Sequence, residues 1–89
     1  MNDEDFILMS WLLNSRYRVE ILQLLNKRSL NPTSISKKIN INVSSVSRIL
    51  KLLKEKELIR YNKKNKGCKK KYVITDDGRR ILSLLCLFS

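Results

Sequence analysis

Hydrophobic residues recur at spacings of three and four along much of this chain, which is the period of an amphipathic helix. The pattern is clearest over 44–57, where one side of the predicted helix is apolar and the opposite side is polar. Ser44 is expected to cap this helix by accepting a hydrogen bond from a free backbone N–H. The apolar stripe consists of Val46, Ile49, Leu50 and Leu53, and the free side carries Ser44, Ser47, Arg48, Lys51 and Glu55.

Two further helices are predicted directly before this one, after the apolar run at 6–13. The first begins at Asn14 or Ser15, ends near residue 28 and has its hydrophobic residues at helical spacing. The second is short and runs from Pro32 to about Ile39, because Asn31 can cap it and a proline in the first helical position loses no hydrogen bond. A tight turn then leads into the helix that follows.

After residue 57 the pattern changes to two short segments rich in Ile, Val, Tyr and Thr, at 58–62 and 71–75. They predict a β-hairpin with a long tip. Thr75 is expected to cap a last helix, whose first turn carries two aspartates that suit the positive end of the helix dipole. Gly78 is expected to weaken that turn slightly, since glycine is a poor helix former.

The two ends of the chain carry apolar runs, at 6–13 and 81–88, that cover every side of a helical projection. Helices of this kind need burial all round. At eight residues each, the runs are far shorter than the roughly 20 residues that cross a bilayer, so we expect no membrane span. The acidic start of the chain also differs from the basic start of a secretory signal, and we expect a cytoplasmic protein.

The length of 89 residues predicts one small domain, and its net charge of +11 is unevenly distributed. Residues 1–14 hold three acids and no base, whereas six of the nine residues in 63–71 are lysine. Such a run repels itself unless water surrounds it or a polyanion lies along it. The run therefore indicates either a solvated loop or a contact with a phosphate backbone.

The sequence lacks the residue patterns of catalytic and metal sites. It contains no His, and Cys68 and Cys86 form no C-x-x-C pair. The globular part also lacks a catalytic paired-carboxylate pattern, and the sequence has no glycine-rich phosphate loop and no nucleophile motif. We therefore expect no enzyme activity, no cofactor and no bound metal.

The order of predicted elements (helix, helix, helix-turn-helix, hairpin, helix) resembles the winged helix-turn-helix family of transcriptional regulators, especially its ArsR-like and MarR-like branches. Within 14–82, ISKKI followed by SSVSRILKLLKEKELI is similar to the two-helix DNA-reading unit of that family, and YVITDDGRRIL is similar to its Thr-x-x-Gly junction between wing and closing helix. The resemblance implies a mainly α fold with a small β-hairpin. It divides a single domain, 1–89, into an N-terminal dimerisation helix (1–13), a winged helix core (14–75) and a C-terminal dimerisation helix (76–89).

The same resemblance implies a homodimeric regulator that binds double-stranded DNA and dimerises through its terminal helices. The metal-sensing branch uses paired cysteines or histidines that this chain lacks, and the ligand-binding branch uses additional helices, so no effector is expected. The residues expected at the dimer interface are Phe6, Met9, Trp11, Leu13, Leu82, Leu85 and Phe88.

The chemistry of the helix at 44–57 also suits DNA binding. Its small serines allow entry into a major groove roughly 12 Å wide, and Arg48 can form two hydrogen bonds to guanine. The first turn of the helix at 32–39 can bind a phosphate, and the lysine run can lie on the sugar-phosphate backbone. The candidate DNA contacts are Thr33, Ser34, Lys37, Ser44, Ser45, Ser47, Arg48, Lys51, Lys63, Lys64, Lys66, Lys69, Lys70 and Lys71.

Two other functions remain open at this point. The lysine run can support a nonspecific, architectural nucleic-acid-binding protein, because lysine contacts to phosphates carry little sequence information. A winged helix can also act as a protein-interaction module, since a fold alone does not determine function.

Overall fold

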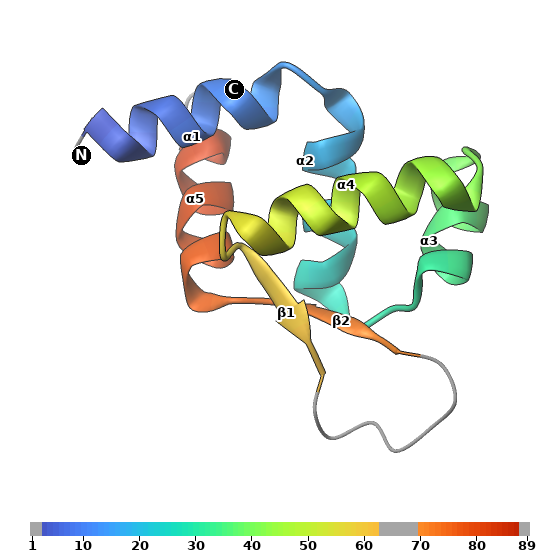
Figure 1. The fold of residues 1–89 in the computed structure, drawn as a ribbon. Coiled ribbons are helices and arrows are strands. Elements are labelled where there is room, and N and C mark those ends of the chain that lie inside the picture. Colours follow the sequence, from blue (N-terminus) through green and yellow to red (C-terminus); the bar gives the residue numbers. More distant parts are fainter. Residues whose placement is uncertain (1–2, 63–69, 88–89) are drawn as a thin grey trace.

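A computed structural model describes residues 3–62 and 70–87 of the chain. These residues form five helices and a two-stranded antiparallel sheet (Figure 1). The predicted fold class, mainly α with a small β-hairpin, is confirmed. In chain order the elements are α1 (Asp3–Leu13), α2 (Arg16–Lys27), α3 (Pro32–Ile39), α4 (Val43–Glu55), β1 (Ile59–Tyr61), β2 (Tyr72–Ile74) and α5 (Asp76–Leu87).

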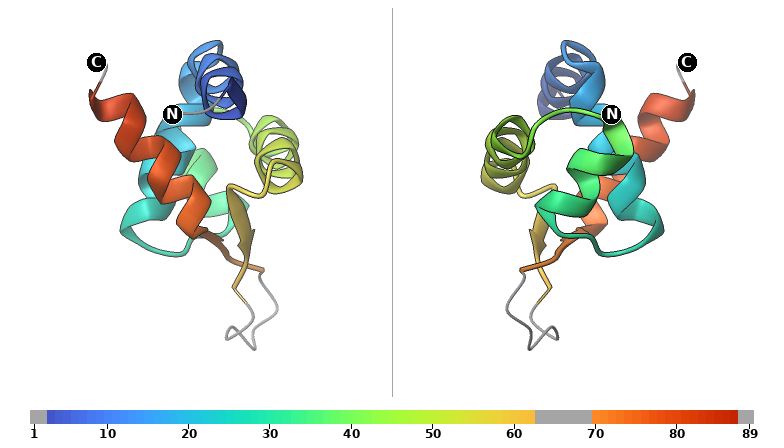
Figure 2. Two further views of the ribbon diagram at one scale, coloured as in Figure 1. Left: turned by 90° about the vertical axis from the view of Figure 1, so that its left-hand side faces the viewer. Right: turned by 90° about the vertical axis from the view of Figure 1, so that its right-hand side faces the viewer.

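Helix α2 lies at the centre of the molecule and packs against the other four helices. α1 and α5 lie on one side of it, and α3 with the beginning of α4 lies on the other (Figures 1 and 2). The hairpin leaves the end of α4 and extends away from the helices. In this arrangement α3, α4 and the hairpin border one side of the molecule.

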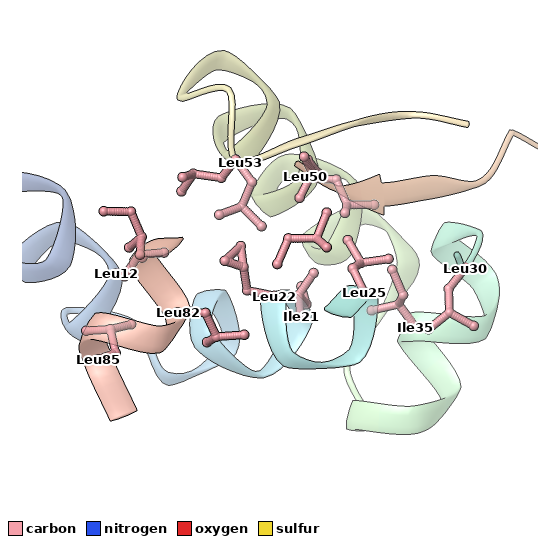
Figure 3. Close-up of a cluster of buried hydrophobic side chains, with 14 of the residues drawn as sticks. Leu12, Ile21, Leu22, Leu25, Leu30, Ile35, Leu50, Leu53, Leu82 and Leu85 are labelled. Carbon is pink, nitrogen blue, oxygen red and sulfur yellow. The ribbon is translucent and has the colours of Figure 1, made fainter. Parts of the chain in front are cut away.

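One hydrophobic core joins these elements (Figure 3). Burying each large aliphatic side chain contributes roughly 1.5–3 kcal/mol, so this core supplies most of the favourable free energy of folding. Ile49, at the edge of the predicted α4 stripe, is half-buried. The side chains with no exposed surface are Leu12, Ile21, Leu22, Ile35, Val46, Leu50, Leu53, Leu58 and Ile81.

Helix α3 begins and ends as the sequence predicts. The Ser34 amide donates a hydrogen bond to Asn31 Oδ1 at 2.7 Å, and Pro32 occupies the first helical position. After Ile39 the chain turns at Asn40, which adopts the left-handed conformation with φ 58°. Asparagine tolerates this conformation better than most residues, and it often ends helices in this way.

Helix α4 runs from 43 to 55 rather than from 44 to 57. Its cap is Asn42 and not Ser44, because the Ser45 amide donates to Asn42 Oδ1 at 2.9 Å. At the other end, the helix stops before Glu57, where φ is 61°. The predicted stripe of α4 is unaffected by these shifts, since both ends change by only one or two residues.

The predicted hairpin is present, and its register places Ile59 opposite Ile74 and Tyr61 opposite Tyr72. Leu30 forms an additional antiparallel bridge with Tyr72, with N···O distances of 3.2 and 2.8 Å. The sequence did not predict this bridge, because a single residue leaves no alternating pattern. The bridge attaches the start of α3 to the hairpin.

Thr75 caps α5 as predicted, since its Oγ1 accepts a hydrogen bond from the Gly78 amide at 3.0 Å. The role predicted for Gly78 was wrong. A Cβ atom at this position would lie 2.2 Å from the Leu58 carbonyl oxygen and 2.6 Å from Ile74 Cγ1. Gly78 is therefore needed for the close packing of α5 against the hairpin, rather than being a weak point of the helix.

An ion pair between Arg80 Nη1 and Asp5 Oδ2, at 2.8 Å, joins α5 to α1. Asp5 is buried, whereas Arg80 is half-exposed. Hydrogen bonding to Asp5 raises the pKa of Arg80 above its usual value. In the described ranges 3–62 and 70–87, no helix is long and apolar enough to span a membrane.

Candidate nucleic-acid interface

The outer side of α4 is exposed, as the sequence predicts. Ser44, Ser47, Arg48 and Lys51 are exposed, and Ser45 is half-buried. The opposite side of the helix lies in the core, so its orientation is fixed by packing. The arginine and the three small hydroxyls therefore project from a rigid element.

The start of α3, the start of α4 and the base of the hairpin meet at one place on the surface. A hollow of about 320 Å³ lies between the start of α3, the start of α4 and the base of the hairpin. It brings together three predicted DNA contacts, Thr33 of α3, Ser47 of α4 and Lys70 next to β2. The other lining residues are Asn31, Pro32, Val43 and Tyr72.

The other predicted DNA contacts outside α4 do not line this hollow. Ser34 is half-buried and its amide is bonded to the cap of α3, whereas Lys37 is exposed in the last turn of that helix. In the hairpin, Lys70 is exposed and Lys71 is half-buried. Lys63, Lys64, Lys66 and Lys69 lie outside the described residues.

A pair of tyrosines lies at the base of the hairpin, and the sequence analysis missed it. The ring centroids of Tyr61 and Tyr72 are 4.8 Å apart, and the Tyr72 hydroxyl donates to the Tyr61 oxygen at 3.3 Å. Lys54 Nζ lies 4.0 Å from the Tyr61 ring centroid, and Lys70 Nζ lies 5.1 Å from it. The register of the hairpin could have indicated the tyrosine pair. No local sequence pattern predicts that Lys54 of α4 packs on Tyr61.

The two hydroxyls of this pair have different acidities. The hydrogen bond that Tyr61 accepts from Tyr72 lowers the pKa of Tyr61, and the positive charges of Lys54 and Lys70 lower it further. Burial raises the pKa of Tyr72 to about 12, and its hydrogen bond to Tyr61 acts in the same direction. Tyr72 therefore keeps its proton and acts as the donor of the pair.

Trp11 connects α1 with α2 and with the residue that follows α4. Arg18 Cζ lies 4.1 Å from the centre of the indole ring, and Arg18 Nη1 donates to the Trp11 carbonyl at 2.6 Å. Lys56 Nζ lies 5.5 Å from the same ring. Much of Trp11, predicted for the dimer interface, is thus engaged within its own chain.

Of the residues predicted for the dimer interface, Phe6 and Leu13 are exposed, whereas three others are buried. Met9, Leu82 and Leu85 are buried in the core of a single chain, so little of their surface is left for contact with a second copy. An apolar run without a polar side shows no preferred face, which is why periodicity could not separate core from surface. Phe88 lies outside the described residues. The exposed apolar side chains of α1 and α5 are Phe6, Ile7, Leu13 and Leu87.

Over residues 3–62 and 70–87, no group of three or more Cys, Asp or Glu side chains is close enough to hold a metal ion, and the sequence contains no His.

Several solved structures share this fold. The chain is similar to the DNA-binding domain of Mb0332 from Mycobacterium bovis (TM-score 0.78, 21% identity, 99% of this chain and 86% of that chain). It is also similar to the adhesin competence repressor AdcR from Streptococcus pyogenes, with a TM-score of 0.74 and 21% identity over 94% of this chain and 68% of that chain. A third similar structure is that of ZitR from Lactococcus lactis, with a TM-score of 0.73 and 21% identity over 82% of this chain and 51% of that chain. The chain thus spans about half the length of ZitR.

The sequence itself matches no curated protein. It does match the family model described as winged helix-turn-helix, over residues 16–88. The match includes α2, α3, α4, both strands and the whole of α5. It agrees with the observed element order and with the resemblance identified in the sequence. The chain therefore belongs to the winged helix-turn-helix family.

Proposed function

We propose that this chain is a cytoplasmic, homodimeric transcriptional regulator that binds double-stranded DNA in a sequence-specific manner. The observation that carries the proposal is the exposed polar side of α4, which lies beside the start of α3 and the lysine-bearing hairpin. Among the similar structures, Mb0332 is described as a homodimeric DNA-binding domain, and ZitR has been solved in complex with DNA.

In this proposal α4 enters the major groove. Arg48 reads guanine through its O6 and N7 atoms, while Ser44, Ser45, Ser47 and Lys51 make the neighbouring contacts. Thr33 and Ser34 bind a phosphate at the start of α3, where the helix dipole favours an anion, and Lys37 adds positive charge. The lysines of 63–71 bind the sugar-phosphate backbone and position the protein without selecting a sequence.

We further propose that a second copy of the chain covers the exposed apolar side chains of α1 and α5. Phe6, Ile7 and Leu13 extend along α1, and Leu87 lies at the end of α5. A symmetric dimer places its two recognition helices in successive major grooves, roughly 34 Å apart. The preferred site is then an inverted repeat.

Selection from a pool of random duplexes, combined with sedimentation of the free protein, tests this function. We expect enrichment of an inverted repeat and a sedimenting species of two chains. Binding of every duplex with equal affinity would contradict the proposal and favour the architectural function suggested by the lysine run. The absence of any duplex binding would favour a protein-interaction module.

A further inference from the structure

The base of the hairpin carries a cluster of two lysines and two tyrosines, which we call the wing-base cluster: Lys54, Tyr61, Lys70 and Tyr72. Lys54 comes from the last turns of α4, Tyr61 ends β1, and Tyr72 begins β2. Lys70 precedes β2 by two residues and is exposed. The cluster thus joins α4 to the hairpin.

The centre of the cluster is the ring of Tyr61. The ammonium groups of Lys54 and Lys70 lie 4.0 and 5.1 Å from its centroid. Two like charges this near to one ring repel each other, and the attraction of each cation to the π-system offsets part of that repulsion. Tyr72 packs against Tyr61 from the paired strand at 4.8 Å, so the position of the ring is fixed.

Neither lysine has an acidic partner among the described residues. Across the described parts of the molecule, 3–62 and 70–87, the ion pairs are made by arginines, and no carboxylate lies within ion-pair distance of Lys54 or Lys70. Two ammonium groups that lie beside one ring and have no acidic partner among the described residues favour an anion with several acceptor oxygens. A phosphodiester group meets that requirement.

The cluster lies on the side of the molecule that the proposed function assigns to DNA. Ser47, Lys51 and Lys54 are spaced by four and three residues, so they follow one line along α4. The hollow beside α4 is lined by Ser47 together with Lys70 and Tyr72. A DNA strand that leaves α4 and approaches the hairpin therefore passes over the wing-base cluster.

We propose that the wing-base cluster is a binding site for one backbone phosphate of DNA, held by Lys54 and Lys70 with the Tyr61 ring positioning both. This inference rests on the proposed function. It adds Lys54 to the DNA contacts and gives Tyr61 a positioning role.

A salt titration of binding to a mixed-sequence duplex tests the site, because each lost phosphate contact reduces the slope of log K against log salt by about 0.9. We expect Lys54→Ala to reduce the slope by up to that amount, because only Lys70 then remains at the phosphate, and to weaken binding by up to roughly 10-fold at ~0.1 M salt. The matched control is Lys56→Ala, which removes the same charge two residues away. Lys56 lies over Trp11 instead of Tyr61, so the salt slope of the Lys56→Ala variant should stay near that of the wild type.

Two substitutions of Tyr61 test the positioning role at constant charge. Tyr61→Phe keeps the ring under both lysines and should bind the duplex almost as the wild type does. Tyr61→Leu removes the ring and should weaken binding several-fold, with thermal melting showing that the variant is still folded. Equal binding by both variants would overturn the positioning role.

The outcomes separate this inference from the function on which it rests. If the wild type binds the duplex and Lys54→Ala matches Lys56→Ala in slope and affinity, the phosphate site is overturned while DNA binding stands. If the wild type itself fails to bind any duplex, the proposed function fails first, and the phosphate site fails with it.

Discussion

At the scale of single residues, the proposed function gives Arg48 and the lysines different roles. Arg48 is exposed on a helix whose opposite side is buried, so packing fixes the direction in which its side chain leaves α4. A bidentate contact to guanine discriminates against other bases, whereas a lysine on a phosphate does not. Substituting these residues should therefore change sequence preference in one case and total affinity in the other.

Arg48→Ala is expected to cost about 1–3 kcal/mol on the selected duplex and little on a mixed-sequence duplex. Titration of both duplexes at one salt concentration measures the two costs. Arg79→Ala serves as the control, because it removes the same charge from α5. An equal loss on both duplexes would show that Arg48 contacts phosphate instead of a base.

Gly78 is a second residue whose substitution gives a sharp result. Replacing glycine with alanine inside a helix ordinarily stabilises it by about 1 kcal/mol. Here the added Cβ would overlap the Leu58 carbonyl oxygen, which also accepts a hydrogen bond from the Thr75 amide. We expect Gly78→Ala to lower the free energy of unfolding by roughly 2 kcal/mol, since overpacking typically costs 1–3 kcal/mol.

Urea denaturation measures that change. Ser83→Ala, at an exposed position of the same helix, is the matched control and should alter the free energy of unfolding by only a few tenths of a kcal/mol. A stabilised Gly78→Ala variant would mean that α5 can move away from the hairpin without cost.

At the scale of elements, the beginning of α4 shows what a sequence can and cannot specify. The sequence predicts Asn31 as the cap of α3, because the proline after it marks the first position of the helix and leaves Asn31 as the only candidate cap. For α4, Asn42 and Ser44 are both good capping residues and lie two positions apart, so composition alone could not separate them. The hydrogen bond from the Ser45 amide to Asn42 decides between them.

Asn42→Ala should therefore lower the free energy of unfolding by about 1 kcal/mol, the usual cost of losing a side-chain cap. Ser44→Ala should change it by no more than a few tenths, because Ser44 is already inside the helix and alanine is the better helix former. Thermal and urea unfolding of the two variants give the comparison. The reverse order of stabilities would restore Ser44 as the cap.

Contacts between distant elements set the other limit on prediction. Helices α3 and α4 and the hairpin were predicted from spacing and turn residues, which are local features. The bridge from Leu30 to Tyr72 and the packing of Lys54 on Tyr61 depend on how separate segments meet. The wing-base cluster therefore became visible only in the folded molecule.

At the scale of the whole molecule, the terminal helices have to serve two purposes. Met9, Leu82 and Leu85 pack into the core of one chain, and the Asp5–Arg80 ion pair holds α1 against α5. The core thus fixes the relative positions of the two helices before any second copy binds. Phe6, Ile7, Leu13 and Leu87 are the apolar side chains left exposed on these helices, and burial of such surface drives association.

Leu13→Glu tests whether this surface forms the dimer. Leu13 is 65% exposed, so a glutamate there can remain in solvent in the monomer, whereas burying it unpaired in a dimer is costly. We expect sedimentation to show two chains for the wild type and one for the variant at the same concentration, with an unchanged circular dichroism spectrum. Binding to the inverted repeat should weaken far more than binding to a single half-site, because only a dimer can place two recognition helices at once.

Gln23→Glu provides the control, since it adds the same negative charge at an exposed position of α2. This variant should remain a dimer and keep its preference for the inverted repeat. If Leu13→Glu also stays dimeric, the second copy must bind elsewhere, and the spacing of the two recognition helices would have to be derived from that other interface.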